Sequence, residues 1–238
     1  MKDLFGQALL DYQNGNYTED IVTSTSISGE DILPLPYLFR DFKDMPSLEQ
    51  KALKLAKGLV LDVGCGAGSH SLYLQKKGLK VKAIDISKGG IEVAKKRGVV
   101  DAEEKNILDE TKSFDTILLL MNGTGIFQEL SQVSKYLTHL KSLLNPDGQI
   151  LIDSSDIKYM YEDEDGGFWV DTNAGYYGEL DYFLSYKGKK ETPMKWLYLD
   201  FETLKLACNA TGLECELVIE GAHFDYLARL SPAKAGIL

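Results

Sequence analysis

The segment Leu59–Lys77 constrains the possible fold more than any other part of the sequence. It begins as a short apolar run, broken only by Asp62, which has the length of a buried strand in a parallel sheet. Glycines then stand at three alternate positions, Gly64, Gly66 and Gly68, and a helix-compatible stretch follows them. Glycine permits positive φ angles and lets a ligand approach the bare backbone. A strand, a glycine turn and a helix therefore place free amide N–H groups and a helix N-terminus beside a bound ligand.

A second strand adds an acidic side chain at the position that a nucleoside-binding site requires. The segment Leu79–Asp85 alternates like a strand and ends in an acid. That acid follows Gly64 at roughly the 20-residue spacing at which a carboxylate accepts the hydroxyls of a ribose. The nicotinamide fingerprint needs glycine at its first, third and sixth positions, whereas Ser69 stands sixth from Gly64 here and Gly68 stands fifth. The two segments predict an adenosine-type cofactor, with a nicotinamide or flavin cofactor as the weaker alternative.

Helices and strands continue to alternate along the rest of the chain. Their periodic patterns end at turn signals such as the Asn-Pro-Asp-Gly sequence at 145–148. We expect helices over residues 48–57, 90–97, 130–144 and 201–211, and further strands over 102–107, 114–121, 149–153, 213–220 and 224–230. This alternation predicts an α/β fold with an open, mostly parallel sheet.

The sequence Val-Gly-Cys-Gly-Ala-Gly at 63–68, with Asp62 before it and Asp85 in register after it, resembles motif I of the class I S-adenosylmethionine-dependent methyltransferases. The resemblance covers roughly residues 48–153 and 200–231. It implies a Rossmann-like, doubly wound, mostly parallel seven-stranded sheet with a reversed C-terminal β-hairpin. We expect one methyltransferase domain over residues 1–238, made of an N-terminal helical cap (1–47), a cofactor-binding core (48–153), a β-hairpin insertion or lid (154–199) and the C-terminal part of the sheet (200–238).

The same resemblance assigns roles at the first two strands. It implies that the glycine loop, Gly64, Cys65, Gly66 and Gly68 included, cradles the methionine part of S-adenosylmethionine. Asp62 would order this loop through backbone N–H groups, and Asp85 would hold the ribose. We also expect Ile86 to pack on the adenine ring.

Further cofactor contacts are expected from three other segments. Asn106 and Ile107 stand where the family often has an acid and a small residue, so we expect Asn106 to accept from the adenine amino group, with Asp109 as the alternative. Met121 and Asn122 follow the fourth strand, beside the expected position of the methyl group. From the cap, Arg40 suits the carboxylate of the cofactor, and Tyr37 suits its sulfonium. In the alternative interpretation, Arg40 is a surface residue and Tyr37 belongs to the core.

Direct displacement at an activated methyl carbon depends mainly on alignment and on exclusion of water. A general base is needed only if the acceptor must lose a proton. We take His223, in the final hairpin turn, as the candidate base, with His70, His139, Asp156, Tyr176 and Tyr177 as rivals. Asn122 is followed by Gly123 and not by the prolines that amino-methylases of DNA and of protein glutamine carry at this point. The aromatic residues of 154–198 suit a small or medium organic acceptor.

Composition narrows the class of partner. Hydrophobic residues make up 44% of the 238, enough for a core without disulfides or metal ions. The three cysteines show neither disulfide nor metal-ligand spacing. The net charge of −10 opposes nucleic acids and anionic membranes, so we expect a small-molecule acceptor and no metal. Without a bilayer-spanning apolar run or a secretory h-region, the chain is expected to be cytoplasmic.

Two other function classes remain at this point. The chain could be a nucleotide-dependent oxidoreductase, which the serine at the sixth position of the glycine motif disfavours. It could also be a non-catalytic cofactor-binding protein, because a fold does not determine a function.

Overall fold

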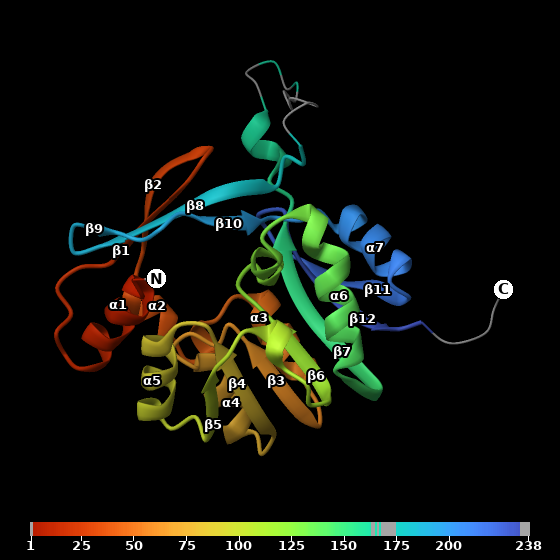
Figure 1. The fold of residues 1–238 in the computed structure, drawn as a ribbon, viewed down its shortest axis with the longest axis horizontal. Coiled ribbons are helices and arrows are strands. Elements are labelled where there is room, and N and C mark those ends of the chain that lie inside the picture. Colours follow the sequence, from red (N-terminus) through yellow and green to blue (C-terminus); the bar gives the residue numbers. More distant parts are fainter. Residues whose placement is uncertain (1, 163–164, 166, 168–174, 234–238) are drawn as a thin grey trace.

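The structure is a computed structural model with two β-sheets (Figure 1), and it describes residues 2–162, 165, 167 and 175–233. Phe168 and Trp169, two of the aromatic residues expected in the insertion, lie outside these ranges. Within them, no helix is long and apolar enough to cross a membrane.

The larger sheet has seven strands in the order β11-β12-β7-β6-β3-β4-β5. Their bounds are β3 (Leu59–Val63), β4 (Lys80–Asp85), β5 (Asp101–Glu104), β6 (Phe114–Leu119), β7 (Leu144–Ser155), β11 (Leu213–Glu220) and β12 (Asp225–Pro232). Neighbours from β5 to β7 pair in parallel, and β12 is antiparallel to both β7 and β11. The predicted mostly parallel seven-stranded sheet with a reversed C-terminal hairpin is therefore confirmed.

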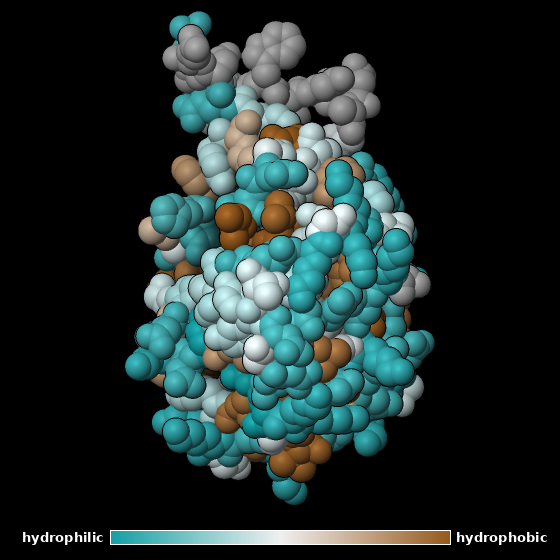
Figure 2. All heavy atoms as spheres, turned by 90° about the vertical axis from the view of Figure 1, so that its left-hand side faces the viewer, coloured by the Kyte–Doolittle hydropathy of each residue, from teal (hydrophilic) through white to brown (hydrophobic). Residues whose placement is uncertain are grey.

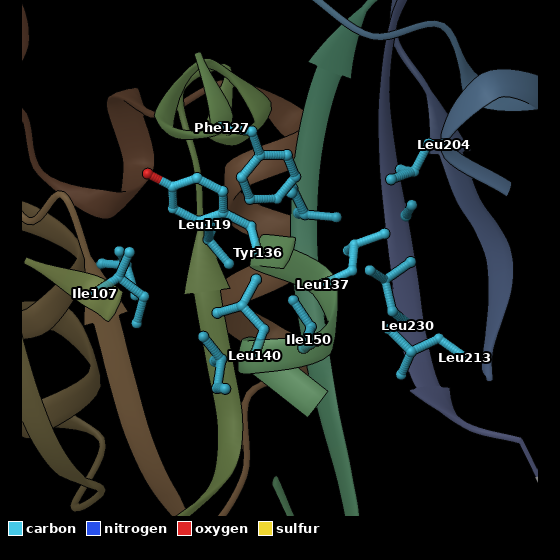
Figure 3. Close-up of a cluster of buried hydrophobic side chains, with 14 of the residues drawn as sticks. Ile107, Leu119, Phe127, Tyr136, Leu137, Leu140, Ile150, Leu204, Leu213 and Leu230 are labelled. Carbon is cyan, nitrogen blue, oxygen red and sulfur yellow. The ribbon is translucent and has the colours of Figure 1, made fainter. Parts of the chain in front are cut away.

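Helices cover both faces of this sheet because its strands bury apolar side chains on both sides. The helices of the core are α3 (Ser47–Leu55), α4 (Ser69–Lys76), α5 (Lys88–Arg97), α6 (Val133–Ser142) and α7 (Phe201–Ala210). Leu137 and Leu140 of α6 pack against Leu119 and Ile150 of the sheet on one face (Figure 3). A second cluster joins the sheet to α3 and α4 on the other face.

Two expected bounds moved because short-range hydrogen bonds replaced the regular pattern. The third strand was expected over 102–107, but β5 ends at Glu104 and Ile107 begins a 3₁₀ turn. The turn expected at 145–148 lies inside β7, where the pairing with β6 is irregular and Asp147 has a φ of 61°. The 3₁₀ turns are Phe42–Asp44, Ile107–Asp109, Gly123–Phe127, Leu130–Gln132 and Lys158–Tyr161.

The smaller sheet joins the N-terminal cap to the insertion (Figure 1). Its strands are β1 (Ile21–Thr25), β2 (Ser28–Leu33), β8 (Glu179–Tyr186), β9 (Lys189–Lys190) and β10 (Met194–Leu197). β1 pairs with β2 on one side and with β8 on the other. The insertion contains the predicted hairpin, since β8 pairs with β10. Besides its helices, the cap contains the hairpin of β1 and β2, which the sequence did not predict, because β1 has its second partner some 160 residues away.

The helices of the cap sit between this smaller sheet and the core. They are α1 (Leu4–Gln13) and α2 (Leu35–Leu38). Leu4 and Leu9 of α1 share an apolar cluster with Ile21 of β1, Leu184 of β8 and Val93 of α5. The side of the molecule that carries the cap has a largely hydrophilic outer surface (Figure 2), in keeping with the net charge of −10.

Candidate functional site

The glycine loop between β3 and α4 has the backbone conformation that its sequence predicts. Gly64, Gly66 and Gly68 have φ angles of 71°, 50° and 79°, a region that residues with a Cβ rarely adopt. A Cβ on Gly68 would also lie 2.7 Å from Val99 Cγ2. The N–H groups of Gly64 and Cys65 donate to the carbonyl of Ile84, at 2.9 and 3.1 Å. The loop is therefore held against the end of β4.

Asp85 ends β4 directly beside this loop. Its Oδ2 accepts from the N–H of Gly66 at 2.8 Å, and its Oδ1 accepts from the N–H of Ser87 at 2.8 Å. Burial raises the pKa of the Asp85 carboxyl, although both N–H bonds favour the charged form. Each carboxylate oxygen has a second lone pair for a further donor. The structure thus brings Asp85 and the glycine loop together, as the spacing predicted.

Asp62 acts on a different partner from the one we expected. It is buried, and its Oδ2 accepts from Ser71 Oγ at 2.5 Å. The loop amides that it was expected to order donate to Ile84 instead. Asp62 therefore fixes the first turn of α4 to β3.

The remaining predicted adenine contacts lie along the same edge. Ile86 is 69% exposed directly after Asp85, so its side chain is available to a ligand. Ile107 is buried, and Asn106 is exposed. Asn106 Oδ1 accepts from the N–H of Leu108 at 2.9 Å and so begins a 3₁₀ turn. Contact of these residues with adenine stays a prediction.

The cap reaches over the glycine loop through contacts that the sequence did not reveal. Asp3 accepts from Ser87 Oγ and from the N–H of Gly89, each at 2.8 Å, as well as from the N–H of Gly6 in its own helix. A Cβ on Gly66 would lie 3.8 Å from the ring of Phe5. An N-cap residue is recognisable at Asp3, but its partners in α5 are not.

Arg97 of α5 adds a second link between the loop and the cap. Its Nη1 donates to the carbonyl of Ala67 in the loop at 2.7 Å, and its Nη2 donates to the carbonyl of Phe39 at 3.2 Å. Ser69 Oγ donates to the carbonyl of Leu38 at 2.9 Å. These bonds hold the end of α2 beside the start of α4.

Arg40 and Tyr37 meet the protein itself where contacts with the cofactor were expected. The guanidinium of Arg40 lies 3.9 Å from the centroid of the Tyr37 ring. Arg40 Nη2 donates to both carboxylate oxygens of Glu49 at 2.5 Å. Arg40 Nε is buried without a partner among the described residues. The forked donor that we assigned to a cofactor carboxylate is thus used by the protein, since Nη1 also donates to the carbonyl of Tyr37 at 2.5 Å.

Glu49 joins Arg40 to His70 in a buried network. His70 Nε2 lies 2.6 Å from Glu49 Oε2. Burial alone would lower the pKa of His70, but the hydrogen bond to Glu49 and the charge of Asp62 raise it. Burial likewise opposes the charge of Glu49, yet His70 and Arg40 lower its pKa. Glu49 therefore occupies Nε2 of His70, and the raised pKa favours the protonated ring.

A cavity of about 300 Å³ opens beside this network, at the carboxyl ends of β6 and β7. It is lined by Tyr37, Pro46, Leu48, Glu49, Met121, Asp153, Ser155 and Asp225. Ligands of open α/β sheets bind at this edge of the strands. Sequence reasoning marked Asp153 only as the end of a strand, although an acid there is the signal that could have identified it.

Asp153 shapes the loop that forms one wall of the cavity. Its Oδ2 accepts from the N–H of Met121 at 3.0 Å and its Oδ1 from the N–H of Gly123 at 2.8 Å. Burial raises the pKa of Asp153 to about 7, despite these two bonds. The loop itself is sharply bent, since Met121 and Asn122 have φ angles of 67° and 59°.

The side chain of Asn122 forms hydrogen bonds with residues of the insertion. Its Nδ2 donates to the carbonyl of Leu197 in β10 at 3.2 Å, and its Oδ1 accepts from Ser154 Oγ at 3.0 Å. Met121 remains 37% exposed at the cavity wall. Of the two residues predicted beside the methyl group, Met121 is thus the one whose side chain faces open space.

His223 lies at the predicted edge of the sheet, bonded to one lining residue of the cavity but not itself among them. It is exposed in the turn between β11 and β12, and its N–H donates to Asp225 Oδ1 at 3.0 Å. The lining residues of the cavity, among those described, do not include it. Its role as a base stays a prediction that this position does not favour.

The rival bases each have a partner. His139 Nε2 lies 2.9 Å from the carbonyl of Ile107. The hydroxyl of Tyr176 donates to Asp200, and that of Tyr177 donates to Asp156. Burial raises the pKa of both tyrosines, so they stay protonated at neutral pH.

The described residues contain no cluster of three or more His, Cys, Asp or Glu that could hold a metal ion.

Known proteins share both the sequence pattern and the fold. Residues 38–218, more than half of the chain, match the family described as "Methyltransferase domain". The chain is also similar to a solved SAM-dependent methyltransferase from Bacteroides fragilis, in complex with S-adenosyl-L-homocysteine. That similarity has 46% sequence identity and a TM-score of 0.92, and it covers 98% of this chain and 96% of the other.

Two curated relatives match a shorter part. The cypemycin N-terminal methyltransferase of Streptomyces sp is 30% identical over 102 residues, which are 41% of this chain and 42% of that protein. The ubiquinone biosynthesis O-methyltransferase of Pelagibacter ubique is 32% identical over 122 residues, which are 48% of each chain. The chain thus spans less than half the length of these curated relatives.

Proposed function

Because this chain belongs to the class I S-adenosylmethionine-dependent methyltransferase family, we propose that it transfers the methyl group of S-adenosylmethionine to a small or medium organic acceptor. The observation that carries the proposal is the contact between the glycine loop and Asp85, with Gly66 N and Asp85 Oδ2 2.8 Å apart. This contact brings bare backbone and a carboxylate that suits ribose hydroxyls to one strand edge.

The residues at this edge fit the cofactor chemically. Gly66 leaves its backbone open to a ligand, since a Cβ there would meet only the ring of Phe5 within 4 Å. Asp85 keeps lone pairs for two hydroxyls, and Ile86 offers an exposed apolar surface for a base. The sulfonium cofactor supplies a methyl group that is already activated. The chain's own task is to hold this group in line with the acceptor and to exclude water.

The relatives support methyl transfer, but they differ in the atom that receives the methyl group. The Bacteroides fragilis protein binds S-adenosyl-L-homocysteine, the demethylated form of the cofactor. One curated relative is named for an O-methyl and the other for an N-terminal methyl transfer. We place the acceptor of this chain at the cavity, because Met121, beside the expected position of the methyl group, lines it.

Calorimetric titration with S-adenosylmethionine, S-adenosylhomocysteine and NAD tests the cofactor. We expect the first two to bind and NAD not to bind. Asp85→Ala should weaken both by about 10–150-fold, because charge-assisted hydrogen bonds contribute about 1.5–3 kcal/mol. Asp101→Ala, an exposed acid at the opposite end of a strand, is the matched control. Unchanged affinity in a folded Asp85→Ala protein, or binding of NAD alone, would refute the assignment.

Transfer itself needs a second measurement. We expect mass spectrometry to detect a methylated product when the protein is incubated with S-adenosylmethionine and a panel of small amines and alcohols. Cofactor binding without turnover of any acceptor would support the non-catalytic alternative.

A further inference from the structure

The cavity at the carboxyl ends of β6 and β7 carries more negative charge than the protein itself neutralises. Three of its lining residues are acids, Glu49, Asp153 and Asp225, and no Lys, Arg or His lines it among the described residues. Glu49 is paired with Arg40 and His70. Asp153 and Asp225 make no ion pair within the described part of the chain, and their hydrogen-bond partners are backbone N–H groups. Neither carboxylate is therefore paired directly with a cation of the protein, although the charge of His70 favours the ionised form of Asp153.

Such an arrangement is costly unless a cation completes it. Asp153 is only 8% exposed, and a buried carboxylate without a positive partner loses the hydration that stabilises its charge. An ammonium group in the cavity would restore a counter-charge and donate hydrogen bonds to Asp153 and Asp225.

The position of the cavity separates it from the ribose end of the cofactor site. Asp85 and the glycine loop stand at β3 and β4, whereas the cavity lies at β6, β7 and β12. Met121 stands between the two, at the end of β6. A volume of about 300 Å³ is at the lower limit of small-molecule sites, which suits the amino end of an acceptor.

We propose that this cavity binds the methyl acceptor as a cationic amine, with Asp153 and Asp225 as its counter-ions and Asp153 as the group that takes its proton. This inference rests on the proposed function. It differs from the amino-methylase arrangement sought at Asn122, because the nitrogen here is an ammonium that a carboxylate deprotonates.

The transfer step balances without a further reactant. The ammonium gives one proton to the Asp153 carboxylate, and the nitrogen lone pair becomes free. That pair forms a bond with the methyl carbon while the carbon–sulfur bond breaks, and its electrons remain on sulfur as a neutral thioether. The product is a methylated ammonium, and Asp153 afterwards returns its proton to solvent.

Sinefungin tests this charge arrangement without knowledge of the acceptor. This analogue of S-adenosylmethionine carries an amine-bearing carbon where the cofactor has its methyl-bearing sulfur, so its additional ammonium points toward the acceptor. S-adenosylhomocysteine has the same α-amino group and lacks this second ammonium. We expect the protein to bind sinefungin at least 10-fold more tightly than S-adenosylhomocysteine, as measured by calorimetry at about pH 8, because one charge-assisted contact is of that order.

Asparagine variants test whether the cavity acids cause the tighter binding of sinefungin. Asp225→Asn and Asp153→Asn should each reduce the preference for sinefungin by about 10-fold and leave the affinity for S-adenosylhomocysteine unchanged. Asp101→Asn, at the opposite end of the sheet, should change neither affinity. Asp153→Asn could disturb the loop whose N–H groups Asp153 binds. In that case the result for Asp225→Asn decides the test.

Two results would overturn the inference and leave the proposed function intact. An equal loss for both ligands would mean that the cavity binds the α-amino group of the cofactor. A preference unchanged in the two variants would mean that the acceptor's charge lies elsewhere. Failure of S-adenosylhomocysteine to bind the unmodified protein would instead contradict the proposed function itself.

The pH dependence gives an independent readout. The groups facing Asp153 are Tyr37 of α2, Glu49 of α3, His70 of α4, and Asp225 and Tyr226 of β12, together with the N–H groups of Met121 and Gly123. Its carboxyl, with a pKa of about 7, loses its charge as the pH falls. The preference for sinefungin should therefore weaken below about pH 7 in the unmodified protein and change less in Asp153→Asn. A preference independent of pH would contradict the part assigned to Asp153.

Discussion

Glu110 carries a charge inside the protein, and its neighbours explain how. It is fully buried, and its Oε2 lies 2.6 Å from Lys82 Nζ and 3.3 Å from Lys105 Nζ. Burial opposes this charge, but the bond from Lys82 and the N–H groups of Lys112 and Thr111 hold the pKa of Glu110 at about 2. Asp153 is the contrasting case, a buried carboxyl whose pKa rises to about 7 because no lysine meets it in the described structure.

Replacement of Glu110 should therefore destabilise the fold strongly. We expect Glu110→Gln to lower the free energy of unfolding by about 3–5 kcal/mol, because Lys82 is left buried with less counter-charge. Glu103→Gln is the matched control, since Glu103 also pairs with Lys82 but is 49% exposed; it should cost at most about 1 kcal/mol. Urea unfolding at neutral pH measures both, and equal costs would contradict the argument.

The same group predicts a pH dependence with a definite sign. The pKa of Glu110 falls from about 4.3 in the unfolded chain to about 2 in the fold. The stabilisation is thus complete above about pH 4.3 and is lost as the pH falls toward 2. In urea unfolding between about pH 5 and 2, the difference between the unmodified protein and Glu110→Gln should shrink. A difference constant over this range would exclude Glu110 as its source.

At the scale of elements, the cap and the insertion behave as one structural unit. β1 and β8 pair although their residues stand some 160 positions apart. Leu184 of β8 also packs in one cluster with Leu9 of α1 and Ile21 of β1. Destabilisation of the insertion should therefore spread to the cap.

Hydrogen exchange can detect this spread. Leu184→Ala should cost about 2–5 kcal/mol locally, the range of buried leucine truncations. Exchange should become faster in β1 and α1 as well as in β8. Phe183→Ala is the control, because Phe183 stands next on the same strand but is 39% exposed. Faster exchange limited to β8 would show that the two segments unfold separately.

At the scale of the whole molecule, the cap is bound to the core around the glycine loop. Asp3 bonds to the start of α5, and Arg97 links the loop to the carbonyl of Phe39. A ligand at the loop should therefore stabilise both parts together.

Thermal unfolding with S-adenosylhomocysteine tests this coupling. At 100 times its Kd the ligand should raise the free energy of unfolding by about 2.7 kcal/mol. Protection from hydrogen exchange should extend from β3 and β4 to α1 and α2 of the cap. NAD at the same concentration should give no shift. Protection limited to the core strands would contradict the coupling.

Local patterns determined much of this fold. The bounds of β11 agree with the strand expected at 213–220, because alternation and turn residues are encoded within each segment. The glycine loop and its contact with Asp85 were also predictable. Positive φ angles demand glycine, and the spacing of a βαβ unit brings two strand ends together.

Tertiary structure decided what a residue's neighbours are. The cap hairpin was missed because β1 is stabilised by a strand far along the chain. Arg40 was assigned to the cofactor, yet Glu49 binds its guanidinium. Asp153 stood out only as the end of a strand until its burial and the cavity were known. The strength and partner of a charge depend on desolvation and on residues distant in sequence, and only the folded chain brings these together.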